Sequence, residues 1–351
     1  MKDKSSFLTD IHRFRGLAIV FIVATHCYQF FSWKEHPFSE AIAKDVFDNS
    51  TVLFMFISGF LFQHLTRAIS YPNYLRRKAQ NVLLPFIIVL TPAIAYALLR
   101  GLPAFTTDPL RDASVSMKVL YLVVYPGSTI NYALWFIPVI AVLYLAAPLF
   151  WVIDKHRYYL VLIALLPLSL LMHRPTYSRD HNLTLALYFS STYVLGMFCS
   201  HYRKHVLGAL DRFFVPLVLL FLADFIAHLL LSDHHGKYTT HEPFEAQEVD
   251  SLIDWMLLQK LLMTMVLLGT VRRFHNHFAR TLDYLAQNSF TIFFLHVYVI
   301  FVIQWLIHFA VIEIRPDYFC ALFVVVIASP CLVASGTRHV FPRWSRSLVG
   351  A

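Results

Sequence analysis

Long apolar stretches alternate with short polar segments along the whole chain. A helix that crosses the hydrocarbon core of a bilayer needs about 20 consecutive apolar residues. Ten windows approach that length and are predicted to be spans: 14–33, 46–66, 79–99, 132–153, 158–173, 183–200, 213–231, 253–271, 287–310 and 318–337. We expect each to be a helix, because lipid cannot hydrogen-bond the backbone of an open strand. The fifth window is short, and an interfacial helix is expected at 116–126.

The composition agrees with a membrane location. Hydrophobic residues make up 58% of the 351 residues and charged residues only 14%, whereas about a quarter of a soluble domain is charged. A soluble enzyme, a disordered chain and a collagen-like fibre are therefore excluded. We predict an all-α polytopic membrane protein in which one domain fills residues 1–351. The four cysteines show neither a disulfide framework nor a zinc-binding spacing.

Lys and Arg are distributed unevenly between the two sets of connecting segments. The segments on the side of the N-terminus contain 19 of them, and the opposite segments contain 9. Cytoplasmic loops carry an excess of Lys and Arg, so we expect both termini in the cytoplasm. The basic composition does not indicate a nucleic-acid partner, because the charge follows this sidedness; the bilayer is the expected partner.

The opposite segment at about 232–252 combines acidic residues with histidines. A metal site is one hypothesis for it, and a solvated loop is the interpretation we prefer, so no metal site is predicted. The residues concerned are Asp233, His234, His235, His241, Glu242, Glu245, Glu248 and Asp250.

An ionisable residue in a membrane span indicates a functional site by default. Arg15 and His26 lie eleven residues apart in the first window. Eleven steps of about 100° are three turns plus about 20°, so both side chains share one helix face, about 16 Å apart along the axis. A buried neutral histidine is suited to act as a general base. The alternative is a structural histidine bonded to a neighbouring helix.

Three other polar features lie in or beside the apolar windows. Asp224 and Lys260 are expected at matching depths in consecutive antiparallel helices, so a buried ion pair is predicted there. His296 stands alone in the ninth window. The basic run at 74–78 (YLRRK) favours an anionic-lipid contact on composition alone, with a phosphate site as the sharper alternative, since Arg offers paired donors to phosphate oxygens.

Together these segments resemble the integral-membrane acyltransferase-3 family. The similar motifs follow one another in the family's order over nearly the whole chain. They are Arg15-Gly16 followed by His26 (Arg-x10-His), FMFISGFL at 54–61, the basic run continued to Leu-Pro at 74–85, LWFIP at 134–138 and SFTIFFLH at 289–296.

The resemblance implies an enzyme that transfers an acyl group, commonly acetyl, from cytoplasmic acyl-CoA to a surface glycan or lipid-linked sugar. His26 would be the catalytic residue and Arg15 its partner, and Arg76, Arg77 and Lys78 would bind CoA. Many members have Asp three residues before the Arg, where this chain has His12. We expect no SGNH domain of the kind that some members carry. The resemblance also implies a multi-pass protein of a bacterial inner membrane. It implies a role in exopolysaccharide synthesis, with the proteins of that synthesis as possible partners.

A geometric mechanism follows from these assignments. A basic cytoplasmic mouth would hold the nucleotide, and the thin pantetheine arm would cover the roughly 16 Å to His26. Ser58 and Tyr132 are candidates for oxyanion stabilisation, Trp135 for stacking on a sugar, and His296 for the substrate site. Acyl-CoA would be a substrate, and no tightly bound cofactor is expected. The alternatives are another acyl group, such as succinyl, and a transporter or flippase of polysaccharide precursors, which would not consume acyl-CoA.

Overall fold

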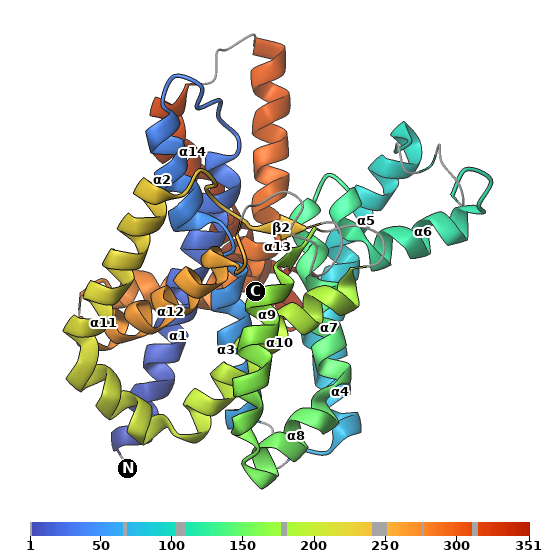
Figure 1. The fold of residues 1–351 in the computed structure, drawn as a ribbon. Helices are drawn as coiled ribbons and strands as arrows, with labels where there is room; N and C mark the ends of the chain where they lie inside the picture. The colour runs from blue at the N-terminus through green and yellow to red at the C-terminus, as the bar shows by residue number, and fades with distance from the viewer. Residues whose placement is uncertain are drawn as a thin grey trace.

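The computed structural model describes residues 2–65, 69–102, 105, 110–176, 181–240, 251–274, 277–310 and 315–351, with the side chains of 2–7 and 310 left out. Over these residues the chain is an all-α bundle (Figure 1). Its first helices are α1 Lys2–Tyr28, α2 Pro37–Phe47, α3 Thr51–Leu65, α4 Tyr71–Lys78, α5 Leu84–Arg100, α6 Val115–Val124, α7 Phe136–Leu145 and α8 Ala147–His156. They are followed by α9 Leu162–Met172, α10 Asn182–His201, α11 Arg203–Leu231, α12 Trp255–Arg273, α13 Ala279–Ala310, α14 Phe319–Val340 and α15 Ser345–Val349.

Short elements connect these helices. A π-helical turn, Ala79–Leu83, joins α4 to α5, and the 3₁₀ turn η4, Tyr132–Trp135, leads into α7. Further 3₁₀ turns are η3 Pro126–Ser128, η5 Tyr159–Val161 and η6 Pro316–Tyr318. The strands β1, Arg174–Pro175, and β2, Thr239–Thr240, pair in parallel.

The predicted all-α polytopic fold is confirmed. Among the described residues, seven helical segments are long and apolar enough to cross a membrane, and the pair α7–α8, which is preceded by η4 and bent by 54°, makes an eighth if it forms one span. The remaining predicted windows, 14–33 and 158–173, coincide with most of α1 and with the short helix α9. A helix also forms at the expected interfacial position, as α6. The sidedness of the termini stays a prediction.

Glycines set the closest helix contacts. A Cβ on Gly59 of α3 would collide with the backbone of Tyr193 in α10, and one on Gly196 of α10 would collide with the carbonyl of Phe56. Gly16 of α1 meets the backbone of α13 at Leu282 in the same way. Small residues allow helix backbones to approach closely in a bilayer. The glycine of the SGF motif therefore packs α3 on α10.

The predicted ion pair between Asp224 and Lys260 is wrong. Lys260 Nζ donates instead to the carbonyls of Asp45 and Val46, at 2.9 and 2.6 Å. These carbonyls lie in the last turn of α2, where they have no partner within the helix and carry the negative end of the helix dipole. The predicted windows include only the last two residues of α2, an eleven-residue helix, so this acceptor was missed.

Candidate active site

His26 of α1 lies beside two aromatic residues from distant parts of the chain. Its ring centroid is 5.1 Å from that of His296 in α13 and 5.1 Å from that of Tyr132 in η4. Three of the predicted site residues therefore meet at one point. α1 and α13 pack side by side through Gly16, and that contact holds the two histidines together.

The hydrogen bonds of His296 define its tautomer. Its Nδ1 lies 3.0 and 2.8 Å from the carbonyls of Ile292 and Phe293, which can only accept, so Nδ1 carries the hydrogen. Its Nε2 is then a bare acceptor, buried without a hydrogen-bond partner among the described residues. Nδ1 of His26 is also buried without a hydrogen-bond partner among those residues. A buried polar atom without a partner is costly. The two rings are thus open to a polar ligand that the structure does not contain.

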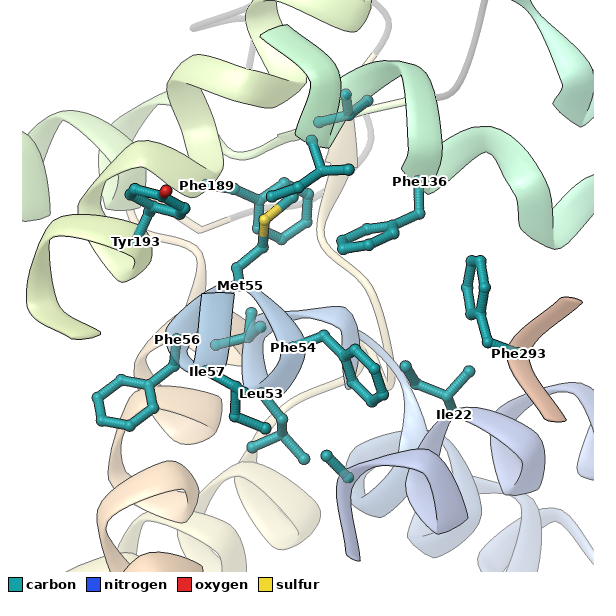
Figure 2. Close-up of a cluster of buried hydrophobic side chains, with 14 of the residues drawn as sticks. Ile22, Leu53, Phe54, Met55, Phe56, Ile57, Phe136, Phe189, Tyr193 and Phe293 are labelled. Atoms are coloured by element: carbon teal, nitrogen blue, oxygen red, sulfur yellow. The ribbon is translucent and has the colours of Figure 1, made fainter. Parts of the chain in front are cut away.

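Two small cavities adjoin His26. The first, of about 20 Å³, is mostly apolar, and Figure 2 shows four of its side chains converging. Its lining residues are Ile22, His26, Thr51, Phe54, Ala133, Trp135, Phe136 and Phe293. The second, of about 40 Å³, shares Ile22, His26, Thr51 and Trp135 with the first, and adds Thr25, Asn49, Ser50, Arg174 and Lys237. His26 stands at the junction of an apolar and a polar space.

Arg174 and Lys237 were not found by sequence reasoning. Arg174 donates to Oδ1 of Asn49 at 3.0 Å and lies 5.0 Å from the centre of the Trp135 ring. Lys237 Nζ is 4.0 Å from Oδ1 of Asp48. Burial lowers the pKa of Lys237, and the Asp48 carboxylate opposes that shift. Both cations lie in connecting segments, and the pairing of β1 with β2 brings those segments together.

A hydrogen-bonded chain extends from Arg174 away from the cavity. Asn49, which holds Arg174, donates to the hydroxyl of Tyr188 at 2.9 Å, and that hydroxyl donates to Oδ2 of Asp254 at 2.7 Å. Asp254 also caps α12 by accepting from the backbone N–H of Leu257 at 2.8 Å. Burial raises the pKa of Asp254 to about 6.

Arg15 lies at the middle of α1, eleven residues before His26. Its Nη2 donates to the carbonyl of Ala286 at 2.8 Å and lies 3.4 Å from Nδ1 of His12, and its buried Nε has no hydrogen-bond partner among the described residues. The nearby acid Asp10 is 3.7 Å from Arg272 instead. None of the described carboxylates forms an ion pair with Arg15.

The basic side chains of the run at 74–78 point in two directions. Arg76 and Arg77 are exposed, whereas Lys78 turns inward, with Nζ 4.4 Å from the centre of the Tyr144 ring. Arg346 of α15 lies close enough to interact electrostatically with both Arg15 and Lys78. These three cations, which we call the basic cluster, come from three distant segments. Arg346 had no sequence signal, because α15 is a helix of five residues.

The remaining nominated residue, Ser58, lies in α3 two turns from Thr51 and lines neither cavity beside His26. Its neighbour Gly59 packs α3 on α10.

Comparison with known proteins identifies the family of the chain. The sequence model of a family described as an acyltransferase domain matches residues 8–335. No curated protein and no solved structure gives a significant match. The match includes His26, His296, Tyr132, Trp135 and the segments that carry Arg174 and Lys237, and it covers nearly the whole chain. The chain therefore belongs to the membrane acyltransferase-3 family.

Proposed function

We propose that the protein transfers an acyl group, acetyl first of all, from cytoplasmic acyl-CoA to a hydroxyl of a cell-surface or exopolysaccharide glycan, in the inner membrane of a bacterium. The observation that carries the proposal is the contact of His26 with His296 at the junction of the two cavities. Open ring nitrogens at that point are suited to remove a proton from an incoming hydroxyl.

The donor would approach from the basic cluster. CoA carries phosphates, and Arg15, Lys78 and Arg346 offer positive charge without a competing carboxylate among the described side chains. Arg15 lies on the same helix as His26, about 16 Å along the axis. The pantetheine arm would cover that distance, while the nucleotide stays outside the hydrocarbon.

The apolar cavity favours a short acyl group. A volume of about 20 Å³ accommodates a group about the size of one water molecule. Phe54, Phe136 and Phe293 enclose it, and a methyl group suits aromatic walls better than a polar group does. Acetyl is the acyl group that matches this description.

The transfer would need no covalent enzyme intermediate. The imidazole of His26 accepts the proton of the sugar hydroxyl, and the oxygen attacks the thioester carbonyl carbon. The C–S bond then breaks, and the leaving thiolate takes the proton from the imidazolium. The hydroxyl of Tyr132, whose ring lies against His26, would donate to the developing oxyanion. Trp135 would support the sugar ring.

Succinyl transfer is a second candidate, and the polar cavity favours it. Arg174 and Lys237 both line this cavity of about 40 Å³ beside His26. A free carboxylate on the acyl group would pair with them. The same cations would equally suit an acidic sugar acceptor with an acetyl donor.

The test is donor turnover and product mass. Membranes that contain the protein, and matched membranes without it, are supplied separately with labelled acetyl-CoA and succinyl-CoA. The released glycan is then analysed by mass spectrometry. Acetyl ester formed only with the protein supports the first candidate, and succinyl ester supports the second. Unchanged acyl-CoA together with protein-dependent appearance of glycan outside would show a transporter and overturn the proposal.

A further inference from the structure

Three metal-ligating side chains from separate elements meet in the half of the bundle that contains β1 and β2. They are Asp45 of α2, His228 near the end of α11 and His235 in the following loop, and their ligand atoms lie within 4.8 Å of one another. Oδ2 of Asp45 is 3.2 Å from Nδ1 of His228 and 2.9 Å from Nδ1 of His235. The exposed fractions of the three side chains are 0%, 5% and 22%, so one edge of the cluster reaches solvent.

His228 is incompletely satisfied in this cluster. Its Nε2 lies 2.8 Å from the hydroxyl of Tyr238, but its buried Nδ1 has no hydrogen-bond partner among the described residues, although the Asp45 carboxylate is close. If Nε2 carries the hydrogen and Tyr238 accepts it, Nδ1 presents a lone pair to a carboxylate oxygen. Two lone pairs facing each other in a buried site repel unless a cation lies between them.

The spacing agrees with such a cation. Ligand atoms at about 2.0–2.2 Å from a tetrahedral Zn²⁺ lie roughly 3.3–3.5 Å apart. The separations of 2.9 and 3.2 Å around Oδ2 of Asp45 need to lengthen by only a few tenths of an ångström. Two imidazole nitrogens and one carboxylate also form a ligand set that zinc sites use, with the fourth position left for water.

Neighbouring groups hold the ligands in place. The backbone N–H of Gly236 donates to Oδ1 of Asp45 at 3.0 Å, which leaves Oδ2 directed at the histidines. Gly236 has a φ of +93°, and a Cβ there would come within 2.8 Å of a carboxylate oxygen of Asp48, so the turn needs glycine. The hydrogen bond between His228 and Tyr238 fixes the other ligand. Such outer contacts orient metal ligands in known sites.

We propose that Asp45, His228 and His235 bind one divalent transition-metal ion, with Zn²⁺ the best match to the ligand set. The ion fastens the loop after α11 to α2. Lys237, two residues from His235, lines the polar cavity beside His26, so the ion also fixes one wall of that cavity. From the sequence we expect a solvated loop here. Among the described residues of that segment, only His235 belongs to the cluster, and residues 241–250 lie outside the described residues.

The experiment measures metal binding and needs no acyl transfer. The full-length protein, purified in detergent with a histidine-free tag, is stripped with a chelator and titrated with ZnCl₂ against a chelating dye. We expect one tightly bound Zn²⁺ per chain, and a Tm that rises with Zn²⁺ concentration. Co²⁺ in its place should give the intense visible absorption of a four-coordinate site. A stripped parent protein that binds no ion in this way overturns the proposal.

Variants locate the ion. Loss of an outer partner of a metal ligand costs roughly 10–100-fold in metal affinity, and we expect a loss of that size for Tyr238→Phe. His235→Ala removes the partly exposed ligand itself and should lower the affinity for Zn²⁺ by more than that. The matched control is His234→Ala, because His234 is in the same loop but its Nε2 lies 2.9 Å from the carbonyl of Lys237. The control should bind like the parent. Equal binding by His235→Ala and the parent overturns the site even if zinc binds.

Discussion

The two sides of His26 differ in how their charged groups are paired. On the side of β1 and β2, the network around Arg174 is satisfied internally: Arg174 bonds to Asn49, and Tyr188 bonds to Asp254. On the side of the basic cluster, Arg15 bonds to a backbone carbonyl, and no described carboxylate pairs with it, with Lys78 or with Arg346.

The difference indicates which side awaits a charged ligand. A half-buried charge such as that of Arg15 or Lys78 is costly without a counter-ion, and in a membrane protein it marks a functional pathway. A side whose polar groups are satisfied internally gains stability from them. A side that accumulates unpaired cations gives up stability that an anionic ligand restores on binding. Substitutions should therefore affect stability on the first side and donor affinity on the second.

The contrast between the two sides of His26 depends first on which side faces the cytoplasm. In the labelling experiment that tests this, we expect full labelling at one position and none at the other. In a Cys320→Ser background, which removes the exposed cysteine, single cysteines replace Lys34 and Arg77, both exposed. An impermeant thiol reagent added to intact cells should label position 34 and not position 77. Labelling of position 77 alone would reverse the assignment of the two sides.

Loss of His26, where the two sides meet, should have the next largest effect. His26→Ala should reduce acyl transfer roughly 10²–10⁴-fold, as expected for loss of a general base, with the protein still in the membrane. The control is His308→Ala, an exposed histidine of α13, which should leave the rate unchanged. Transfer by His26→Ala at the parent rate, measured with labelled acyl-CoA, would make the histidine structural.

A break in the satisfied network should cost stability. Asp254→Ala removes the cap of α12 and the acceptor of the Tyr188 hydroxyl, which together should lower the free energy of unfolding by about 2–4 kcal/mol. Arg346→Ala, on the other side, should change it by less than about 0.5 kcal/mol. Denaturation in detergent measures both. If Arg346→Ala is the more destabilising change, the contrast between the sides is lost.

The sequence predicts the helices better than it predicts the site. Apolar windows locate the spans, because lipid requires continuous helices. They miss α2 and α15, which are eleven and five residues long, and with them the partner of Lys260 and the position of Arg346. Such short helices form only against the rest of the bundle, and no local apolar pattern indicates them.

The site itself combines residues that no local pattern connects. His26 and His296 lie in separate windows, and only the family resemblance suggested that both matter. Arg174 and Lys237 lie in connecting segments that meet through the pairing of β1 with β2, a contact between residues far apart in sequence. Asn49 holds Arg174 from a backbone position with φ of +56°. A position of this kind becomes apparent only in the folded chain.

The basic cluster should bind the donor more strongly than it stabilises the protein. Arg15→Gln should weaken the binding of acyl-CoA about 10-fold or more, because a charge-assisted hydrogen bond contributes about 1.5–3 kcal/mol. Arg346→Gln should weaken it less, because the side chain of Arg346 is exposed and solvent screens its charge. Arg343→Gln is the control, since Arg343 is exposed on the segment that precedes α15. Titration of the purified variants with acyl-CoA gives the affinities. Unchanged affinity in both Gln variants would leave the unpaired cations without a ligand.

The exposed arginines of α4 should produce the smallest effect, and their substitutions separate two functions of a basic segment. Arg76 and Arg77 are exposed, unlike Lys78, so solvent screens their interactions with phosphate. Arg→Lys at both positions keeps the charge but loses the paired donors. We therefore expect a loss of donor affinity of a few-fold, and a larger loss for the double Arg→Ala variant. An anionic-lipid anchor predicts the reverse pattern, namely reduced insertion with normal affinity in the protein that folds. Titration of acyl-CoA against equal amounts of folded parent and variant separates donor binding from lipid anchoring. Equal affinities would assign this basic run to the membrane surface and leave donor binding to the cluster of Arg15, Lys78 and Arg346.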